Sequence, residues 1–244
     1  MTEIWKKTRF RLGTFVRILS SPFYESTASL DESCTIFASG FGDSGWHHIR
    51  KTLEEYDENP SIKPKETTIW NFLKNFQPLS INKLASVELE NDFDLFDYPW
   101  GSCSQLVLPN EKSVLQSRFC GPSKIDFINK EFYRTINLYK KIMNEGYNPN
   151  TYPHRHVTGT WLISDTGEKR FIVMSGNHRT AILAHLGYKK IKVRTSSSSI
   201  RLVNESDINT WKYVKSKFCK VGDAKQIFDF FFENNGYHIR DLIE

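Results

Sequence analysis

Polar and cationic side chains crowd into one six-residue stretch, made of Ser175, Gly176, Asn177, His178, Arg179 and Thr180. Gly176 can adopt a positive φ and lets other atoms approach its backbone closely. The residues after it can begin a helix, whose first amides have no partner within the helix and whose dipole is positive at that end. With the imidazole of His178 and the guanidinium fork of Arg179, these amides predict a turn that binds phosphate.

Regular elements must flank this turn to hold it in place. Residues 171–174 are a short apolar and partly β-branched run, which predicts a strand. Ala181, Ile182 and Leu186 recur at helical spacing, and Gly187 stands where the helix would end. Residues 188–194 then predict a second strand. The chain therefore reads strand, tight turn, short helix, strand across this region.

The turn resembles the corresponding motif of the ParB/sulfiredoxin superfamily. ParB partition proteins carry Gly-Glu-Arg-Arg there, sulfiredoxins Gly-Cys-His-Arg and free-serine kinases Gly-His-His-Arg, where this chain has Gly176-Asn177-His178-Arg179. The His178 and Arg179 pair is closer to the last two branches. The resemblance covers residues 104–200 and implies that the turn holds nucleotide phosphates. Asn177 stands in the place of the sulfiredoxin cysteine, which argues against reduction of a sulfinic acid.

The resemblance also points to two residues upstream of the turn. Arg118 stands where an arginine of ParB-like domains reaches the ligand, although pairing with a surface acid is an equal alternative. Glu131, in the first turns of a helix predicted over residues 126–145, is a candidate for the catalytic base of the kinase branch. A solvated helix residue is the alternative for Glu131. The kinase branch has an aspartate where this chain has Ser175, so the function of that position lies elsewhere or is absent.

The implied function is that of a nucleotide-dependent kinase acting on a small hydroxylated metabolite or a saccharide. ATP or ADP, with CTP as a further option, and Mg²⁺ would be the cofactors. Phosphoryl transfer needs positioning and charge neutralisation, which the turn offers, with His178 near the transferring group and a carboxylate to take the acceptor proton. The first alternative is a catalytically silent protein that binds a phosphorylated ligand in polysaccharide or lipid assembly.

The second alternative is a ParB-like nucleotide switch that binds DNA. Partition proteins carry a helix-turn-helix domain after this core, whereas about fifty residues follow Arg194 here and include no basic recognition helix. The net charge of +5 favours anionic partners without choosing among them. The sequence therefore argues against nucleic acid and favours a nucleotide and a small substrate.

Composition describes an ordinary globular chain. Of its 244 residues, 39% are hydrophobic and 25% are charged, and no apolar run approaches the roughly 20 residues that span a bilayer. The four cysteines are scattered, with no C-x-x-C pair and no secretory signal sequence before them. We therefore expect a cytoplasmic protein, peripheral to the inner face of the membrane if its basic N-terminus binds lipid.

The expected fold class is α+β, a small mixed ParB/sulfiredoxin-like sheet with flanking helices, an N-terminal extension and C-terminal helices. Residues 1–24 form a basic amphipathic segment, whose residues 1–19 either contact a membrane surface or pack on the protein body. Residues 25–100 are an extension of unknown role and residues 101–200 are the nucleotide-binding core. Residues 201–244 hold two expected helices, over 206–219 and 223–236; the second, rich in phenylalanine, is a lid or a homodimer contact.

Two histidine pairs have residue types that could bind a metal ion. His47 and His48 follow a glycine-rich loop and begin a helix expected over residues 48–56, where adjacent side chains should point apart. His154 and His156 would share one face of a strand, but no third ligand is visible nearby. The sequence therefore predicts no metal bound directly by the protein.

Overall fold

The computed structural model describes residues 23–102, 119–151, 156–196 and 200–243. The predictions on residues 1–22, Arg118 and His154 lie outside these residues. A mixed six-stranded sheet forms the centre of the fold, in the order β1-β7-β5-β6-β2, with β8 beside β5. An α+β fold with a mixed sheet and flanking helices is thus confirmed. The strands are β1 (Phe23–Ser29), β2 (Ser33–Thr35), β5 (Val157–Ile163), β6 (Lys169–Ser175), β7 (Lys190–Ser196) and β8 (Leu202–Asn204).

The strands around the turn follow the predicted order. β5 and β6 are antiparallel and are joined by a hairpin in which Ser164 donates its N–H to Glu168 O. β6 leads into helix α7 (Asn177–His185), and β7 returns parallel to β5, with Val157 opposite Val193. The strand, turn, helix, strand prediction is confirmed.

The stretch 25–100 supplies both outer strands of this sheet. β1 lies antiparallel along β7, and β2 lies parallel to β6, with Cys34 opposite Ile172. These strands complete backbone hydrogen bonds that β6 and β7 would otherwise leave open at the sheet edges. The extension is therefore built into the same sheet as the core.

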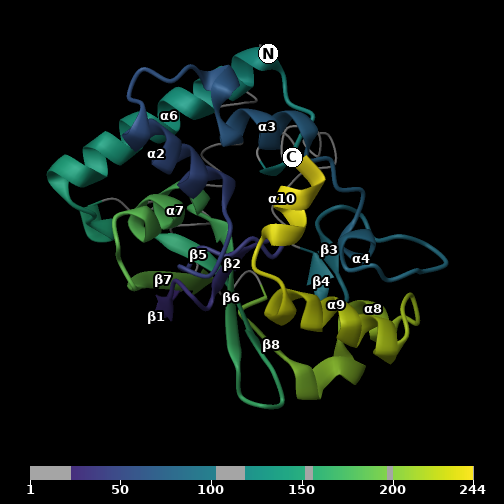
Figure 1. Ribbon diagram of the computed structural model, residues 1–244. Coiled ribbons are helices and arrows are strands. Elements are labelled where there is room, and N and C mark those ends of the chain that lie inside the picture. The colour runs from purple at the N-terminus through teal and green to yellow at the C-terminus, as the bar shows by residue number, and fades with distance from the viewer. Residues whose placement is uncertain (1–22, 103–118, 152–155, 197–199, 244) are drawn as a thin grey trace, which may run out of the picture.

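Helices α2 (His48–Glu58), α6 (Ile125–Glu145) and α7 gather on one side of the sheet (Figure 1). α7 packs against both α2 and α6. The helix predicted over 126–145 is confirmed as α6, which buries Ile128 and Phe132 and ends at Gly146, where φ is +74°. Shorter elements complete this half: η1 (Pro64–Glu66), α3 (Thr68–Asn75), α4 (Ile81–Leu84), β3 (Asp97–Tyr98), β4 (Gly101–Ser102) and η3 (Pro149–Thr151).

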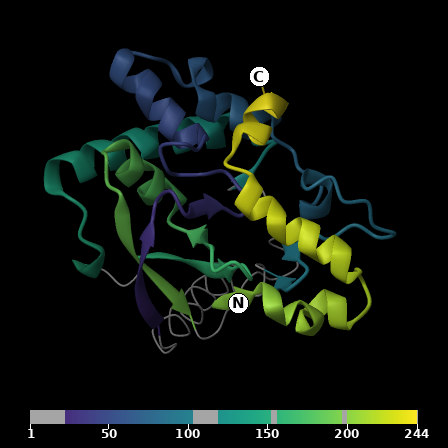
Figure 2. The same cartoon turned by 60° about the horizontal axis from the view of Figure 1, so that its bottom comes forward.

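The C-terminal helices lie on the opposite side of the molecule from β1 and β7, as both views show (Figure 1, Figure 2). The helix expected over 206–219 is wrong. Trp211 takes an extended conformation that buries its ring, and Lys217 has a φ of +61°, so the segment breaks into short pieces. These elements are η5 (Glu205–Thr210), α8 (Lys212–Lys215), α9 (Val221–Glu233) and α10 (Tyr237–Ile243).

Aromatic packing ties α9 to the N-terminal half. Phe228 and Phe231 are fully buried, and both contact the ring of Trp100. Tyr98 stacks on Trp100 and donates its hydroxyl to Ile36 O at 2.9 Å. The phenylalanines of α9 therefore belong to the core, while a homodimer stays a prediction. In the described parts of the chain, no helix combines the length and hydropathy needed to cross a bilayer.

Candidate functional site

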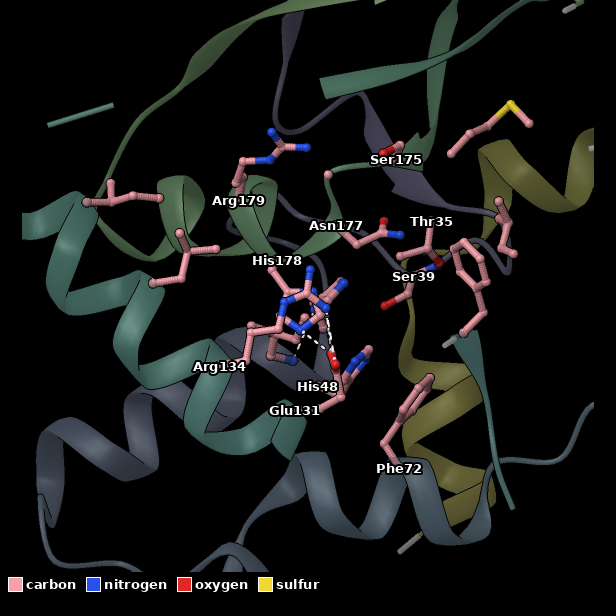
Figure 3. Close-up of a pocket in the computed structure, with 18 of the residues that line it drawn as sticks. Thr35, Ser39, His48, Phe72, Glu131, Arg134, Ser175, Asn177, His178 and Arg179 are labelled. Atoms are coloured by element: carbon pink, nitrogen blue, oxygen red, sulfur yellow. Dashed lines mark hydrogen bonds and ion pairs between the residues drawn. The ribbon is translucent and has the colours of Figure 1, made fainter. Parts of the chain in front are cut away.

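A cavity of about 890 Å³ lies where α6, the start of α7, the start of α2 and the turn after β2 meet. Five of the predicted site residues line it: Ser175, Gly176, Asn177, His178 and Arg179. Glu131 reaches the same cavity from α6 (Figure 3). The structure therefore brings the predicted turn and the predicted carboxylate into one site.

Gly176 sets the shape of the turn. Its φ of +100° and ψ of 16° are left-handed, and a Cβ at this position would lie 3.1 Å from both Val157 Cγ2 and Arg179 Nη2. Thr180 donates its N–H and its hydroxyl to Gly176 O, at 2.9 and 3.0 Å. Thr180 is fully buried and does not line the cavity, so it supports the turn from behind.

The start of α7 has polar groups without partners. Among the described residues, no hydrogen bond engages the N–H of Asn177 or of His178, as the first turn of a helix leads one to expect. Asn177 Oδ1 is buried without a hydrogen bond. His178 points toward Glu131, whereas Arg179 leaves the helix away from that carboxylate (Figure 3). The turn thus presents amides and two different side chains to the cavity.

Glu131 is the centre of a small charge cluster. Its Oε2 lies 3.1 Å from His178 Nε2, which is an ionic contact without hydrogen-bond alignment, and Arg134 Nη1 lies 3.1 Å from both carboxylate oxygens. The carboxylate side chain is only 14% exposed, so a solvated surface role is wrong. Burial alone raises the pKa of Glu131, but His178 and Arg134 outweigh burial and lower it below its usual value.

His47 and His48 also line the cavity, and the expectation that their side chains point apart is wrong. His47 precedes α2 in an extended conformation, so its ring stacks on that of His48 with centroids 4.6 Å apart. His48 in turn stacks on Phe72 at 3.7 Å. Burial lowers the pKa of His47 to about 3 and that of His48 well below its usual range, so both imidazoles are neutral.

Sequence reasoning missed one wall of the cavity. The side chains of α6 that line it share one helical stripe, and that spacing was visible in the sequence. They are Phe127, Glu131, Arg134, Leu138, Lys141, Ile142 and Glu145. Tyr147, which follows this helix, lies on the same wall; burial raises the pKa of its hydroxyl, an effect that Arg179 partly offsets.

His156, the described member of the second histidine pair, lies elsewhere. His156 does not line the cavity; it is buried near the ion pair of Arg194 and Glu25, and burial lowers its pKa. In the described ranges, no three His, Cys, Asp or Glu side chains are grouped to hold a metal ion. Compared with family models, curated proteins and solved structures, the chain matches none of them.

Proposed function

We propose that this protein is a nucleotide-dependent phosphotransferase, a kinase that binds ATP or ADP in the cavity and phosphorylates a small hydroxylated metabolite or a saccharide. The observation that carries the proposal is the Gly176 turn, which begins a helix in the cavity wall with the His178 and Glu131 contact beside it. A volume of about 890 Å³ has room for a nucleotide and a small acceptor together.

The phosphates would lie against the start of α7. The N–H groups of Asn177 and His178 and the positive end of the helix dipole favour an anion there. Arg179 adds a guanidinium that can bind two phosphate oxygens at once. Charge that spreads over the transferring phosphoryl group would be neutralised by groups that are already in place.

The acceptor hydroxyl would lose its proton to His178. Among the described residues, His178 Nδ1 has no hydrogen bond, while Nε2 faces the ionised Glu131 carboxylate. A carboxylate beside one imidazole nitrogen stabilises the cation that forms when the other accepts a proton. The lowered pKa makes Glu131 a weak base by itself, so we assign it the supporting role in this pair.

Magnesium does not fit as an ion held by the described residues. The carboxylate of Glu131 is already engaged by His178 and Arg134, and Glu145 lies near Lys141, with 3.7 Å between their charged atoms. Magnesium needs converging oxygen ligands and commonly binds through substrate phosphates. We therefore keep Mg²⁺ as a companion of the nucleotide and assign it no step.

A protein that binds a phosphorylated ligand without turnover is the second candidate. The weak basicity of Glu131 and the presence of Ser175, in place of the aspartate found in the kinase branch, favour it. Both candidates use the same anion site, so binding alone does not separate them. Formation of a phosphorylated product does.

Thermal unfolding with ATP, ADP and CTP, each with and without Mg²⁺, tests the binding site. A nucleotide at 100 times its Kd should raise the melting temperature by about 5–10 °C. Arg179→Ala should abolish the shift, whereas Arg201→Ala, which changes an exposed arginine over Tyr24, should retain it. No shift with any nucleotide would overturn the proposal.

Product formation tests catalysis. The full chain, a labelled nucleotide and a pooled metabolite extract should give a phosphorylated product that Arg179→Ala fails to make. Nucleotide binding without a product would favour the silent phospho-ligand-binding protein. Salt-sensitive binding to duplex DNA would instead favour the ParB-like switch.

A further inference from the structure

Unpartnered polar atoms gather on the wall of this cavity. Eight buried side-chain nitrogen or oxygen atoms in the described ranges have no hydrogen bond, and four of them belong to residues that line the cavity. Buried polar atoms are normally paired, so this concentration indicates that ligand atoms complete the missing hydrogen bonds. Three of these atoms, His47 Nε2, His48 Nδ1 and Asn177 Oδ1, have no partner in the described ranges, whereas the fourth, His178 Nε2, is already in ionic contact with Glu131.

The role of His47 follows from its position at the start of α2. Its Nδ1 accepts a hydrogen bond from the Ile49 N–H at 3.1 Å, so in the neutral ring the proton must be on Nε2. The ring is 1% exposed and stacks on both Phe41 and His48, which prevents it from turning. His47 Nε2–H is therefore a fixed donor that needs an acceptor.

The cavity wall also needs a hydrogen-bond donor from the ligand. Asn177 Oδ1 is buried and accepts no hydrogen bond. An ionised phosphate oxygen can accept from His47 but cannot donate to Asn177. A hydroxyl group can do both, so a ligand that carries several hydroxyls satisfies this mixture of groups.

Charge separates the two parts of the cavity. The charged side chains that line the cavity all come from α6 and α7, three cations (Arg134, Lys141 and Arg179) and two carboxylates (Glu131 and Glu145). The lining residues contributed by the described part of the N-terminal half include no lysine, arginine, aspartate or glutamate. His47 and His48 are neutral imidazoles. The phosphates are thus drawn to the α7 side, and an uncharged group suits the α2 side.

We infer that the start of α2 is the acceptor subsite and that the acceptor is an uncharged polyhydroxylated molecule, a sugar or a polyol, bound through His47 Nε2–H and Asn177 Oδ1. This inference rests on the proposed function, because the acceptor must lie beside a nucleotide phosphate. It narrows the hydroxylated substrate to one without a carboxylate or an amine.

Two substitutions at His47 separate its contact with the ligand from its structural role. His47→Asn keeps an acceptor for the Ile49 N–H, as asparagine is a good N-cap, but removes the distal donor. His47→Gln extends an amide donor to that distal position but loses the cap, which should lower the melting temperature by about 2–4 °C. His185→Asn, which changes a histidine outside the cavity lining, is the matched control.

Saturation-transfer NMR on the full chain with saturating ATP should test glucose, ribose, glycerol, inositol and serine as probes. At least one uncharged polyol should bind to the unsubstituted protein and to His185→Asn. Its affinity should fall about tenfold in His47→Asn and stay within about threefold in His47→Gln, with unchanged nucleotide affinity in all variants.

The outcomes distinguish the two proposals. If no polyol binds, if serine binds in preference, or if affinity follows melting temperature across the variants, the acceptor subsite is overturned. If polyols bind with the expected pattern but no nucleotide shifts the melting temperature, the subsite stands and the kinase proposal fails. A product from the preferred polyol and ATP would support both.

Discussion

The carboxylate of Glu131, on α6, lies 3.1 Å from the imidazole Nε2 of His178, in the first turn of α7. This contact joins the Gly176 turn to the longest helix of the described chain. It also places one negative charge among the cations of the cavity, with Arg134 on its other side. The pair should therefore matter more for turnover than for nucleotide binding.

Glu131→Gln should lower phosphoryl transfer by about 100-fold, because the amide no longer stabilises a protonated His178. Nucleotide affinity should change by less than about threefold, since the proposed phosphate site is at the start of α7. Steady-state kinetics and thermal shift measure the two effects. Glu54→Gln, which removes an exposed carboxylate paired with Lys51, is the control; full activity in Glu131→Gln would contradict the assignment.

Stability should fall in mild acid because His47 is buried in its neutral form. Its pKa is about 3, below the usual 6.5, so the unfolded chain binds more protons between these values. The contribution of neutral His47 to the free energy of unfolding is complete above about pH 6.5. It decreases toward pH 3, by up to roughly 1.4 kcal/mol per pH unit.

In His47→Asn, the side chain at position 47 cannot bind a proton in this pH range. Between about pH 7 and about pH 5, the unsubstituted protein should therefore lose about 2 kcal/mol more stability than this variant. Urea unfolding at both pH values measures the difference. Parallel losses in the two proteins would show that His47 is not held neutral.

Gly176→Ala should destabilise the protein and abolish nucleotide binding. An alanine at position 176 would have to adopt a φ of +100°, and its Cβ would crowd Val157 and Arg179. Gly167→Ala is a matched control, because Gly167 also has a positive φ but its Cβ would meet no atom within 4 Å. Backbone strain should lower the free energy of unfolding of both variants by about 1–2 kcal/mol, and the steric contacts should lower that of Gly176→Ala further. Chemical unfolding measures both losses.

Thr180→Val should weaken the turn without touching the ligand. The buried hydroxyl donates to Gly176 O, so its loss should cost about 1 kcal/mol and lower nucleotide affinity modestly. Thr210→Val removes a hydroxyl that also bonds a backbone carbonyl, but on the surface, and should be nearly neutral. Equal melting temperatures for the two variants would show that the Thr180 hydroxyl does not stabilise the turn.

The site turn was predictable because its determinants are local. A β-branched run, a glycine at a left-handed position and apolar residues at helical spacing fix strand, turn and helix within one short segment. The long helix was predictable for the same reason, since Ile128 and Phe132 keep helical spacing and Gly146 provides the stop. The broken segment after Glu205 was not, because burial of the Trp211 ring overrides local helical preference.

By itself, the sequence determined the α+β class and the Gly176 turn, and it named His178 and Glu131 as separate candidates. Only the tertiary structure decided that Glu131 meets His178, that residues 25–100 complete the sheet, and that His47 and His48 line the same cavity. Periodicity fixes which face of an element is buried but not which distant element covers it. Packing of the whole fold decides which distant segments of the chain meet, and the cavity wall at α2 follows from that packing.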